Sequence, residues 1–251
     1  MHFYTSRRLF TTAVASIATP RLSALRVRTI GTTATALATA MSTSSSNTNV
    51  VSAAVAFLEG EKRLVDSISP TDFTAIDAKV GGSVGGHVRH TLDHFQKCLA
   101  AARLPAASAG DEHHGLAARI RYDHRMRGGD VETDPAAASD LVVSLLQQLQ
   151  ALQRGAYDLR TVLVNPTFTL ALENGTEEFG FDSNLERELY FCCHHGIHHD
   201  AMIKLILRGM GERGETALGQ LGANFGVAPS TADFRRSEQI TYKSGKTAKG
   251  R

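Results

Sequence analysis

The sequence predicts an all-α fold: a four-helix bundle with a long crossover and a small β-hairpin insertion before the last helix. Three observations support this prediction. Apolar residues recur at helical spacing in four segments. Hydrophobic residues make up 42% of the 251 residues, whereas aromatic residues make up 6% and Trp is absent, which favours an aliphatic helical core. An Asn-Gly pair lies between two alternating segments, which is typical of a hairpin.

The first two predicted helices differ in how they begin and end. The first spans about 50–67 and ends before Pro70, and its apolar positions are Val51, Val55, Leu58, Leu64 and Val65. The second spans about 84–102 and begins after the loop Gly81-Gly82-Ser83. Its apolar face consists of Val84, Val88, Leu92, Phe95 and Leu99. The periodicity of this face predicts an amphipathic helix.

The last two predicted helices have recognisable N-terminal signals. Asp134 before Pro135 is an N-cap followed by proline at the first helical position, and this helix is expected to run to about Val162. Residues 167–181 carry the predicted hairpin. The fourth helix opens with the capping box at 183–186 and ends at Gly209. Its expected apolar positions are Leu189, Tyr190, Ile197 and Leu205.

Three regions are expected along the chain. Residues 1–48 are rich in Arg, Ser, Thr and Ala and lack acidic residues, which is typical of a transit peptide or a disordered extension. Residues 49–234 form the helical domain, and 235–251 form a basic disordered tail. The Arg content favours import into the mitochondrion. A plastid is the alternative, or the cytoplasm if translation starts at Met41.

Charge and hydropathy exclude two classes of function. Residues 1–58 hold five Arg and no acidic residue, which leaves 22 basic against 25 acidic residues in the rest of the chain. The domain is therefore not a basic surface for nucleic acid. No stretch approaches the 18 apolar residues of a membrane span. The three cysteines make no disulfide framework and are expected to be small buried or half-buried residues.

Histidines on the second and fourth predicted helices indicate a metal site. His194, His195, His198 and His199 lie within six residues, and His195 and His199 are one helical turn apart. The second helix adds His87, His90 and His94, which share a face. One of these with His195 and His199 would bind an ion through three imidazoles and leave a position for a small-molecule substrate.

Two other interpretations remain open at this point. A fourth protein ligand, such as Cys193 or His94, would close the site and favour a non-catalytic metal-binding or stress-linked protein. Alternatively, the histidines form a polar core network without metal. The metalloprotease pattern H-E-x-x-H, the Glu-x-x-His pairs of di-iron bundles and a P-loop are all absent from the sequence.

The chain also resembles a known superfamily. Five blocks carry the resemblance: Ser-Val-Gly-Gly-His-Val-Arg-His at 83–90, Tyr-Asp-His-Arg-Met-Arg at 122–127, Val-Glu-Thr-Asp-Pro at 131–135, the histidine cluster at 194–199, and Phe-Gly-Val-Ala-Pro-Ser-Thr at 225–231. In this order they resemble an uncharacterised subgroup of the DinB/YfiT-like metal-binding four-helix bundles. The resemblance covers about 50–232.

The resemblance implies a site and a class of function. Its metal triad falls on His90, His195 and His199. His87 is the alternative for the first ligand, and His198 is the alternative ligand on the last helix. It implies a divalent transition metal, Zn²⁺ or Ni²⁺, and a hydrolase or thiol transferase. Asp200-Ala201-Met202 departs from the Arg-Gly-Gln common in the family. Bundles of this kind often dimerise, so a homodimer is a further alternative.

Candidate roles follow for four other side chains. His198 and His87 are the candidate general bases beside the metal. Arg125 in the long crossover is expected to anchor an anionic group of the substrate, and Asp123 to orient a histidine. The alternative for this charged segment is a surface loop held by its own ion pairs.

Overall fold

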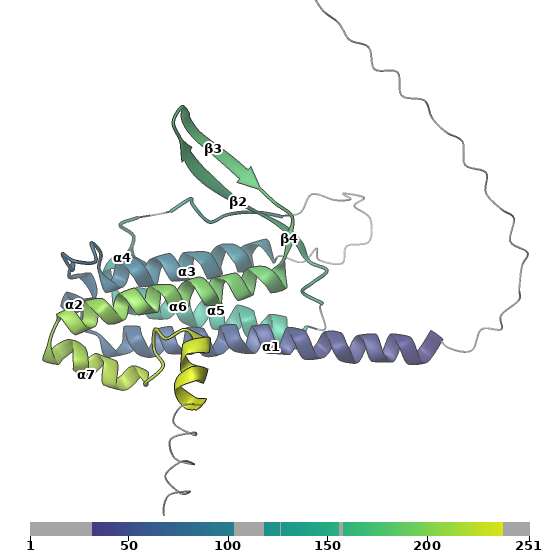
Figure 1. Cartoon of the computed structure of the whole chain (residues 1–251), viewed down its shortest axis with the longest axis horizontal. Coiled ribbons are helices and arrows are strands. Elements are labelled where there is room, and N and C mark those ends of the chain that lie inside the picture. Colours follow the sequence, from purple (N-terminus) through teal and green to yellow (C-terminus); the bar gives the residue numbers. More distant parts are fainter. Residues whose placement is uncertain (1–31, 103–117, 126, 156–157, 238–251) are drawn as a thin grey trace, which may run out of the picture.

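The described part of the chain is rich in helices and carries one small sheet (Figure 1). The computed structural model describes residues 32–102, 118–125, 127–155 and 158–237. Most of the predicted transit segment and of the predicted basic tail therefore lies outside the described residues. Seven helices and four strands are named: α1 Thr32–Ser67, α2 Pro70–Thr74, α3 Val84–Ala101, β1 Ala118–Arg121, α4 Asp130–Thr133, α5 Pro135–Arg154, β2 Leu163–Leu172, β3 Gly175–Gly180, β4 Ser183–Asn184, α6 Leu185–Gly209 and α7 Glu212–Leu221.

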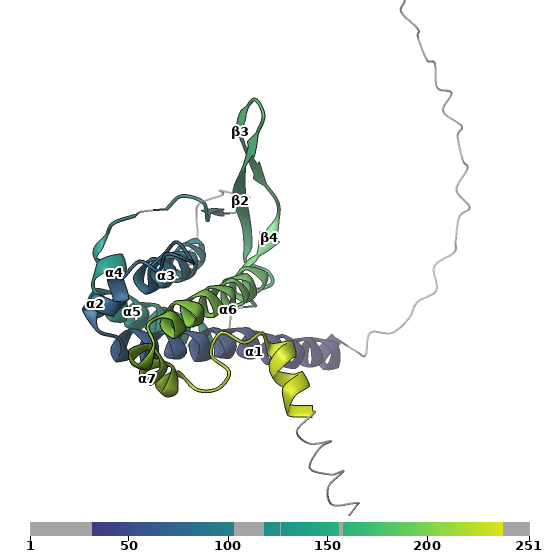
Figure 2. The same cartoon turned by 60° about the vertical axis from the view of Figure 1, so that its left-hand side comes forward.

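Four long helices enclose the core. Helix α1 packs against α5 and α6, and α3 packs against the same two helices. Figures 1 and 2 show them side by side, with α1 extending beyond the others at its N-terminal end. The fully buried large side chains between them include Leu58, Leu92, Phe95, Leu145 and Leu189. None of the described helices combines the length and apolar character needed to cross a membrane.

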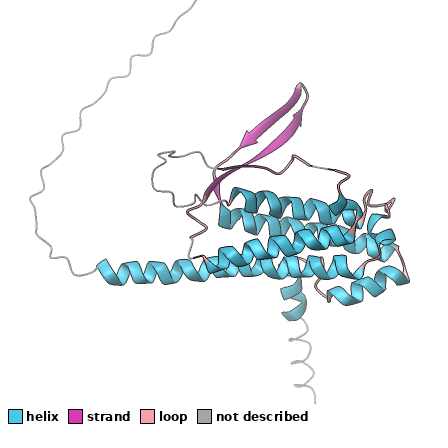
Figure 3. Ribbon diagram, turned by 180° about the vertical axis from the view of Figure 1, so that it is seen from behind, coloured by secondary structure: helices cyan, strands magenta, loops and turns pink. Residues whose placement is uncertain are grey.

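The sheet is larger than the predicted hairpin. Strands β2 and β3 pair antiparallel with Leu172 opposite Gly175, which places the turn at Glu173-Asn174. Strand β1 adds in parallel to β2, and β4 pairs antiparallel with the start of β2. Figure 3 shows the sheet on one side of the helices, and β1 and β4 contact α3 and α6 respectively. The sheet can therefore cover one side of the space between α3 and α6.

Helix α3 agrees closely with the prediction. The Ser83 side chain accepts a hydrogen bond from the Gly86 amide at 3.0 Å and so caps the helix. All five predicted apolar positions are buried. Helix α5 instead ends at Arg154, eight residues before the predicted end, because Gly155 turns extended and the next described residues form a turn around Asp158.

Helix α6 begins and packs differently from the prediction. The N-cap is Asn184 rather than Ser183, and its side chain accepts from the Arg187 amide at 3.0 Å. Tyr190 and Leu205, expected in the core, are 63% and 54% exposed. The buried face instead includes Leu185, Leu189, Cys192, Gly196, Asp200, Ile203 and Leu207. This face repeats at intervals of three and four residues, so a tyrosine and a leucine between the repeats point outward.

A glycine lets α6 approach α1. A Cβ at Gly196 would lie 2.3 Å from Cζ of Phe57, a distance that carbon atoms do not reach without displacement. Phe57 in turn stacks on Phe95 of α3, with ring centroids 5.6 Å apart. The three helices thus meet in one layer beside the histidines of α6.

Candidate metal centre

Five histidines from two helices lie together between α3 and α6. Helix α3 contributes His87, His90 and His94, which are spaced to share one face. Helix α6 contributes His195 and His199, one turn apart. His90 and His94 are buried, and the other three are half-buried. Segments about one hundred residues apart in the sequence therefore supply a single cluster of imidazoles.

Nε2 of His195 contacts the Nε2 atoms of two other imidazoles. Nε2 of His195 lies 3.1 Å from Nε2 of His90 and 3.1 Å from Nε2 of His199. In a neutral imidazole each ring nitrogen is either a donor or an acceptor, so one nitrogen cannot bond well to both neighbours. An ion at 2.0–2.1 Å from both nitrogens of either 3.1 Å pair would bind them at an angle of roughly 95–100°, which transition metals accept. The donor set therefore fits a metal ion.

His94 belongs to an overlapping group. Ring nitrogens of His90, His94 and His195 all lie within 4.8 Å of one another, so these three could hold a metal ion. Nδ1 of His94 lies 2.9 Å from the carbonyl oxygen of His90, to which it can donate. That hydrogen bond leaves Nε2 of His94 unprotonated in the neutral ring.

His87 contacts His199 on the side away from His195. The two Nδ1 atoms are 2.8 Å apart, so one of them carries the proton. If His199 donates, its Nε2 keeps a lone pair for a metal, which is the usual second contact of a metal-binding histidine. His87 was the alternative first ligand in the sequence prediction. In the structure its Nδ1 contacts Nδ1 of His199.

The electrostatic environment keeps these histidines neutral. Burial, followed by the charges of His94 and Arg125, lowers the pKa of His90 to about 2. Burial lowers the pKa of His199 to about 3 and that of His94 to about 4. The pKa values of His87 and His195 are also lowered, mainly by burial and then by His198. Neutral imidazole is the form that binds metals.

Two other residues considered in the sequence lie outside the cluster. His198 is exposed, and its ring centroid lies 5.5 Å from that of His199. Cys193 lines a separate pocket together with Val50 and Tyr190, and burial raises the pKa of its thiol to about 12. All three cysteines are free, two of them buried and Cys193 half-buried, as expected.

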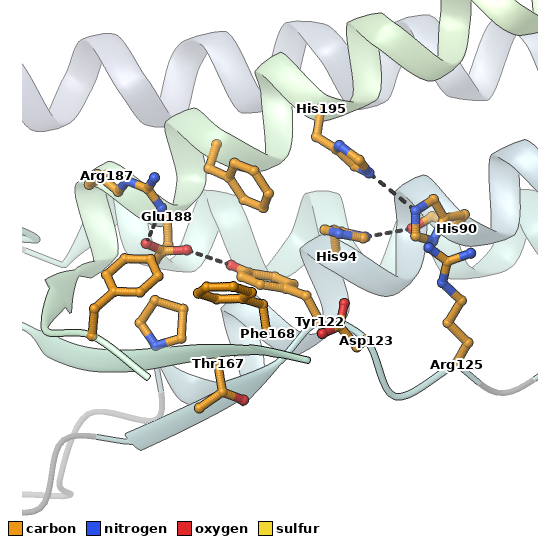
Figure 4. Close-up of a pocket in the computed structure, with 13 residues that line it drawn as sticks. His90, His94, Tyr122, Asp123, Arg125, Thr167, Phe168, Arg187, Glu188 and His195 are labelled. Carbon is orange, nitrogen blue, oxygen red and sulfur yellow. Dashed lines mark hydrogen bonds and ion pairs between the residues drawn. The ribbon is translucent and has the colours of Figure 1, made fainter. Parts of the chain in front are cut away.

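A cavity of about 290 Å³ opens from the histidines (Figure 4). Its walls come from α3, α6, the segment after β1, and β2, so the sheet closes the side that the helices leave open. His90, His94 and His195 form one end. The other lining residues are Tyr122, Asp123, Arg125, Pro166, Thr167, Phe168, Phe181, Arg187, Glu188 and Phe191.

The charged segment after β1 reaches this cavity. Arg125, the predicted anchor for the substrate, and Asp123, which was expected to orient a histidine, both line it. The Asp123 carboxylate accepts a hydrogen bond from the Thr169 amide at 2.5 Å, and so ties the segment to β2. The orienting contact found for His94 is the backbone carbonyl of His90 instead. The charge of Arg125 contributes to the low pKa values of His90, His94 and His195.

Several lining residues were not singled out from the sequence. The Tyr122 ring stacks on the His94 ring, with centroids 4.8 Å apart and planes 8° apart. Its hydroxyl donates to Glu188 at 2.9 Å, and Glu188 is fully buried. Glu188 precedes His195 by seven residues, two helical turns. This spacing, which places a carboxylate on the histidine face of α6, is the signal that could have identified it.

Comparison with known proteins gives limited information. No family model matches the chain, and no solved structure matches it. One curated protein that is similar is FK506-binding protein 5 from Rhizopus delemar, which is 30% identical over 112 residues. The match covers 45% of this chain and 26% of the fungal protein, so the chain spans about a quarter of that relative.

Proposed function

We propose that this chain is a DinB-like four-helix-bundle metalloprotein that binds one divalent transition ion, Zn²⁺ or Ni²⁺, through His90, His195 and His199. The bundle would consist of α1, α3, α5 and α6, with the sheet as an insertion beside it. The observation that carries the proposal is that Nε2 of His195 lies 3.1 Å from Nε2 of His90 and 3.1 Å from Nε2 of His199.

The adjoining cavity supports an enzyme, either a metal-dependent hydrolase or a thiol transferase. A bound ion would supply Lewis-acid chemistry at the histidine end. His94 lines the cavity, whereas His87 and His198 are not among the lining residues. With Nδ1 hydrogen-bonded to the His90 carbonyl, Nε2 of His94 can accept a proton from a nucleophile in the cavity. His94 is therefore better placed as general base than the two histidines first considered.

A non-catalytic metal-binding protein is the alternative, and the position of His94 is what favours it. If Nε2 of His94 binds the ion as a fourth ligand, no position remains for a substrate. The two functions thus differ in whether His94 faces the ion as a ligand or faces the cavity as a base.

Metal analysis of the full chain, purified without a histidine tag, tests the proposal. We expect about one transition ion per chain and its loss in His195→Ala. His198→Ala is the matched control, because His198 is an exposed neighbour on the same helix and should leave the metal content unchanged. Equal metal content in wild type and His195→Ala would refute the site. Removal of the metal by a chelator should abolish ester hydrolysis or thiol transfer by the loaded protein, and Zn²⁺ should restore it.

A further inference from the structure

The cavity extends away from the histidines to a second polar group. Figure 4 shows Arg187 and Glu188 at the end opposite His90, with Tyr122 and Phe168 between the two ends. A ligand that fills this cavity therefore meets the candidate metal site at one end and Arg187 at the other. Its volume of about 290 Å³ is close to the lower limit of roughly 300–1,000 Å³ for ligand pockets, so the ligand is small.

The walls between the two ends are largely aromatic. Phe168 and Phe181 are 40% and 43% exposed, which is high for large apolar side chains. Phe191 and Tyr122 form the opposite part of the lining, with ring centroids 5.3 Å apart. Covering these rings with an apolar group would be favourable by roughly 25 cal/mol per Å² of buried surface. The walls thus favour a ligand with a flat apolar body.

Arg187 contacts two aromatic rings and a carboxylate at the far end of the cavity. Its guanidinium carbon lies 5.6 Å from the ring centroid of Phe181 and 5.4 Å from that of Phe191, both within cation–π range. Nη1 donates to Glu188 at 2.7 Å. The side chain is half exposed, and the guanidinium has five N–H donors, of which the described residues engage one. A guanidinium with N–H donors that the described residues do not engage is suited to bind a carboxylate through two hydrogen bonds.

Glu188 does not compete for this role. It is fully buried and accepts hydrogen bonds from Tyr122 at 2.9 Å, from Ser183 at 2.6 Å and from Arg187 at 2.7 Å. Its oxygens are therefore occupied by donors of the protein. A ligand at this end meets the N–H groups of Arg187 rather than free carboxylate oxygens.

We propose that the cavity binds a small monocarboxylate with a flat apolar body, whose carboxylate contacts Arg187 and whose opposite end faces His90, His94 and His195. The inference rests on the proposed function, because it names the substrate class of the same site. It adds Arg187 as an anchor remote from the histidines and distinct from Arg125, which lies near them.

Calorimetric titration of the metal-free full chain tests the anchor. The probes are 3-phenylpropionate and its neutral amide, 3-phenylpropanamide, which share the ring and the spacer. We expect the carboxylate to bind at least about tenfold more tightly than the amide, as for a charge-assisted hydrogen-bonded pair. Arg187→Met should remove this preference. Arg160→Met is the matched control, because Arg160 also pairs with a nearby carboxylate, Asp158, but lies outside the cavity.

Two results would overturn the inference: equal binding of acid and amide by the wild type, or a preference that survives in Arg187→Met. The inference would also be overturned if Arg125→Met lost the preference while Arg187→Met kept it, because the carboxylate would then lie at the histidine end. Removing Arg187 leaves the buried Glu188 charge uncompensated, which can unfold the protein. The double variant Arg187→Met, Glu188→Gln removes both charges while Gln can still accept from Tyr122, and it should lose the preference as well.

The metal-free format separates this inference from the proposed function. If the chain binds no metal, the proposed function fails, but a carboxylate preference that depends on Arg187 still supports the anchor. In the Co²⁺-loaded protein, the ring protons of bound 3-phenylpropionate should broaden more than the methylene protons beside the carboxylate. The opposite order would place the carboxylate at the histidines and refute the proposed orientation.

Discussion

Nε2 of His195 lies 3.1 Å from Nε2 of His90, although 105 positions separate the two residues in the chain. The contact joins α6 to α3 at the end of the cavity. His199 adds a third Nε2 at the same distance from His195. Two nearly equal contacts to one nitrogen suit an ion better than a chain of hydrogen bonds.

The first prediction separates the two groups of three histidines. His199→Gln should weaken Zn²⁺ binding by more than about a hundredfold, because loss of a ligand exceeds the 10–100-fold effect typical of outer contacts. His94→Gln should change it by less than about tenfold. His87→Gln, which removes the contact to Nδ1 of His199, should fall between them. Competition with a chromophoric chelator measures all three, and a larger effect at His94 than at His199 would assign His94 to the metal.

The second prediction concerns acid stability of the metal-free protein. The folded-state pKa values of His90, His94 and His199 are about 2, 4 and 3, below the ordinary value of 6.5. The unfolded chain therefore takes up protons first as the pH falls, and stability is lost progressively from about pH 6.5 down toward these values. Two buried carboxyl groups, Glu61 and Asp200, have raised pKa values and act in the opposite direction over the same range. The contribution of the histidines is therefore measured by urea unfolding with EDTA at pH 7.5 and pH 5.0, as a change in the free energy of unfolding that depends on these histidines.

A variant comparison shows whether these histidines cause the change. His94→Gln should raise the free energy of unfolding at pH 5.0 relative to that at pH 7.5, because glutamine does not titrate. His194→Gln, which alters an exposed histidine on the same helix as His195, should retain the wild-type difference between the two pH values. An equal change in His94→Gln and wild type would contradict the assignment.

Much of the fold could be predicted because its signals are local. Helix α3 was predicted within one residue at its end, since Ser83 caps it and its apolar spacing is regular. The end of α5 was missed because apolar residues continue past Gly155 into the turn that precedes β2. Strands β1 and β4 are short and are defined by pairing with β2, which is a contact between distant segments. Such pairing leaves little periodicity in the sequence.

Part of the candidate site could also be predicted from local signals in the sequence. Spacing on single helices identified His195, His199 and one histidine of the second predicted helix as candidates, and the resemblance selected His90. In the structure, His195 contacts both His90 and His199. The far end of the cavity was not predicted, because Tyr122 and Glu188 meet only when the segment after β1 folds against α6. The separation of Arg187 from Arg125 likewise depends on tertiary structure.

The third prediction concerns a buried pair of carboxyl groups. Glu61 of α1 is 1% exposed and Asp200 of α6 is 6% exposed. Within the described part of the chain, no hydrogen-bond partner is found for either oxygen of Glu61 or for Oδ1 of Asp200. Burial, followed by repulsion from Asp200, raises the pKa of Glu61. Burial raises the pKa of Asp200 to about 6. Because the folded state prefers the protonated acids, these groups cost stability as the pH rises above their ordinary pKa values, and the cost of Asp200 is complete above about pH 6.

Glu61→Gln should therefore stabilise the protein at pH 7.5, by roughly 1–3 kcal/mol, the cost of burying an unsatisfied polar group. The gain should shrink at pH 4.5, where Glu61 is protonated in the wild type. Glu59→Gln is the control, because Glu59 is exposed on the same helix and should change the free energy of unfolding by less than about 0.5 kcal/mol. A loss of stability in Glu61→Gln at pH 7.5 would show that the carboxylate has a stabilising partner.

The last prediction links the packing of α6 to the histidines. A Cβ at Gly196 would lie 2.3 Å from Cζ of Phe57 and push α6 away from α1. Gly196→Ala should destabilise the protein by about 1–3 kcal/mol, despite the higher helix propensity of alanine. It should also weaken metal binding, because residue 196 adjoins His195 and a displacement of α6 lengthens the contact between His195 and His90. Thermal unfolding and chelator competition measure the two effects.

Two further variants identify the cause. Gly219→Ala in α7 is the matched control, because a Cβ there meets no atom of the described residues within 4 Å, and alanine should stabilise that helix by up to about 1 kcal/mol. Phe57→Leu in the Gly196→Ala background removes the outer atoms of the ring and should recover part of both losses. If the second change restores stability but not metal affinity, the displacement of α6 is not what weakens the site, and the alanine must act on the imidazole of His195 directly.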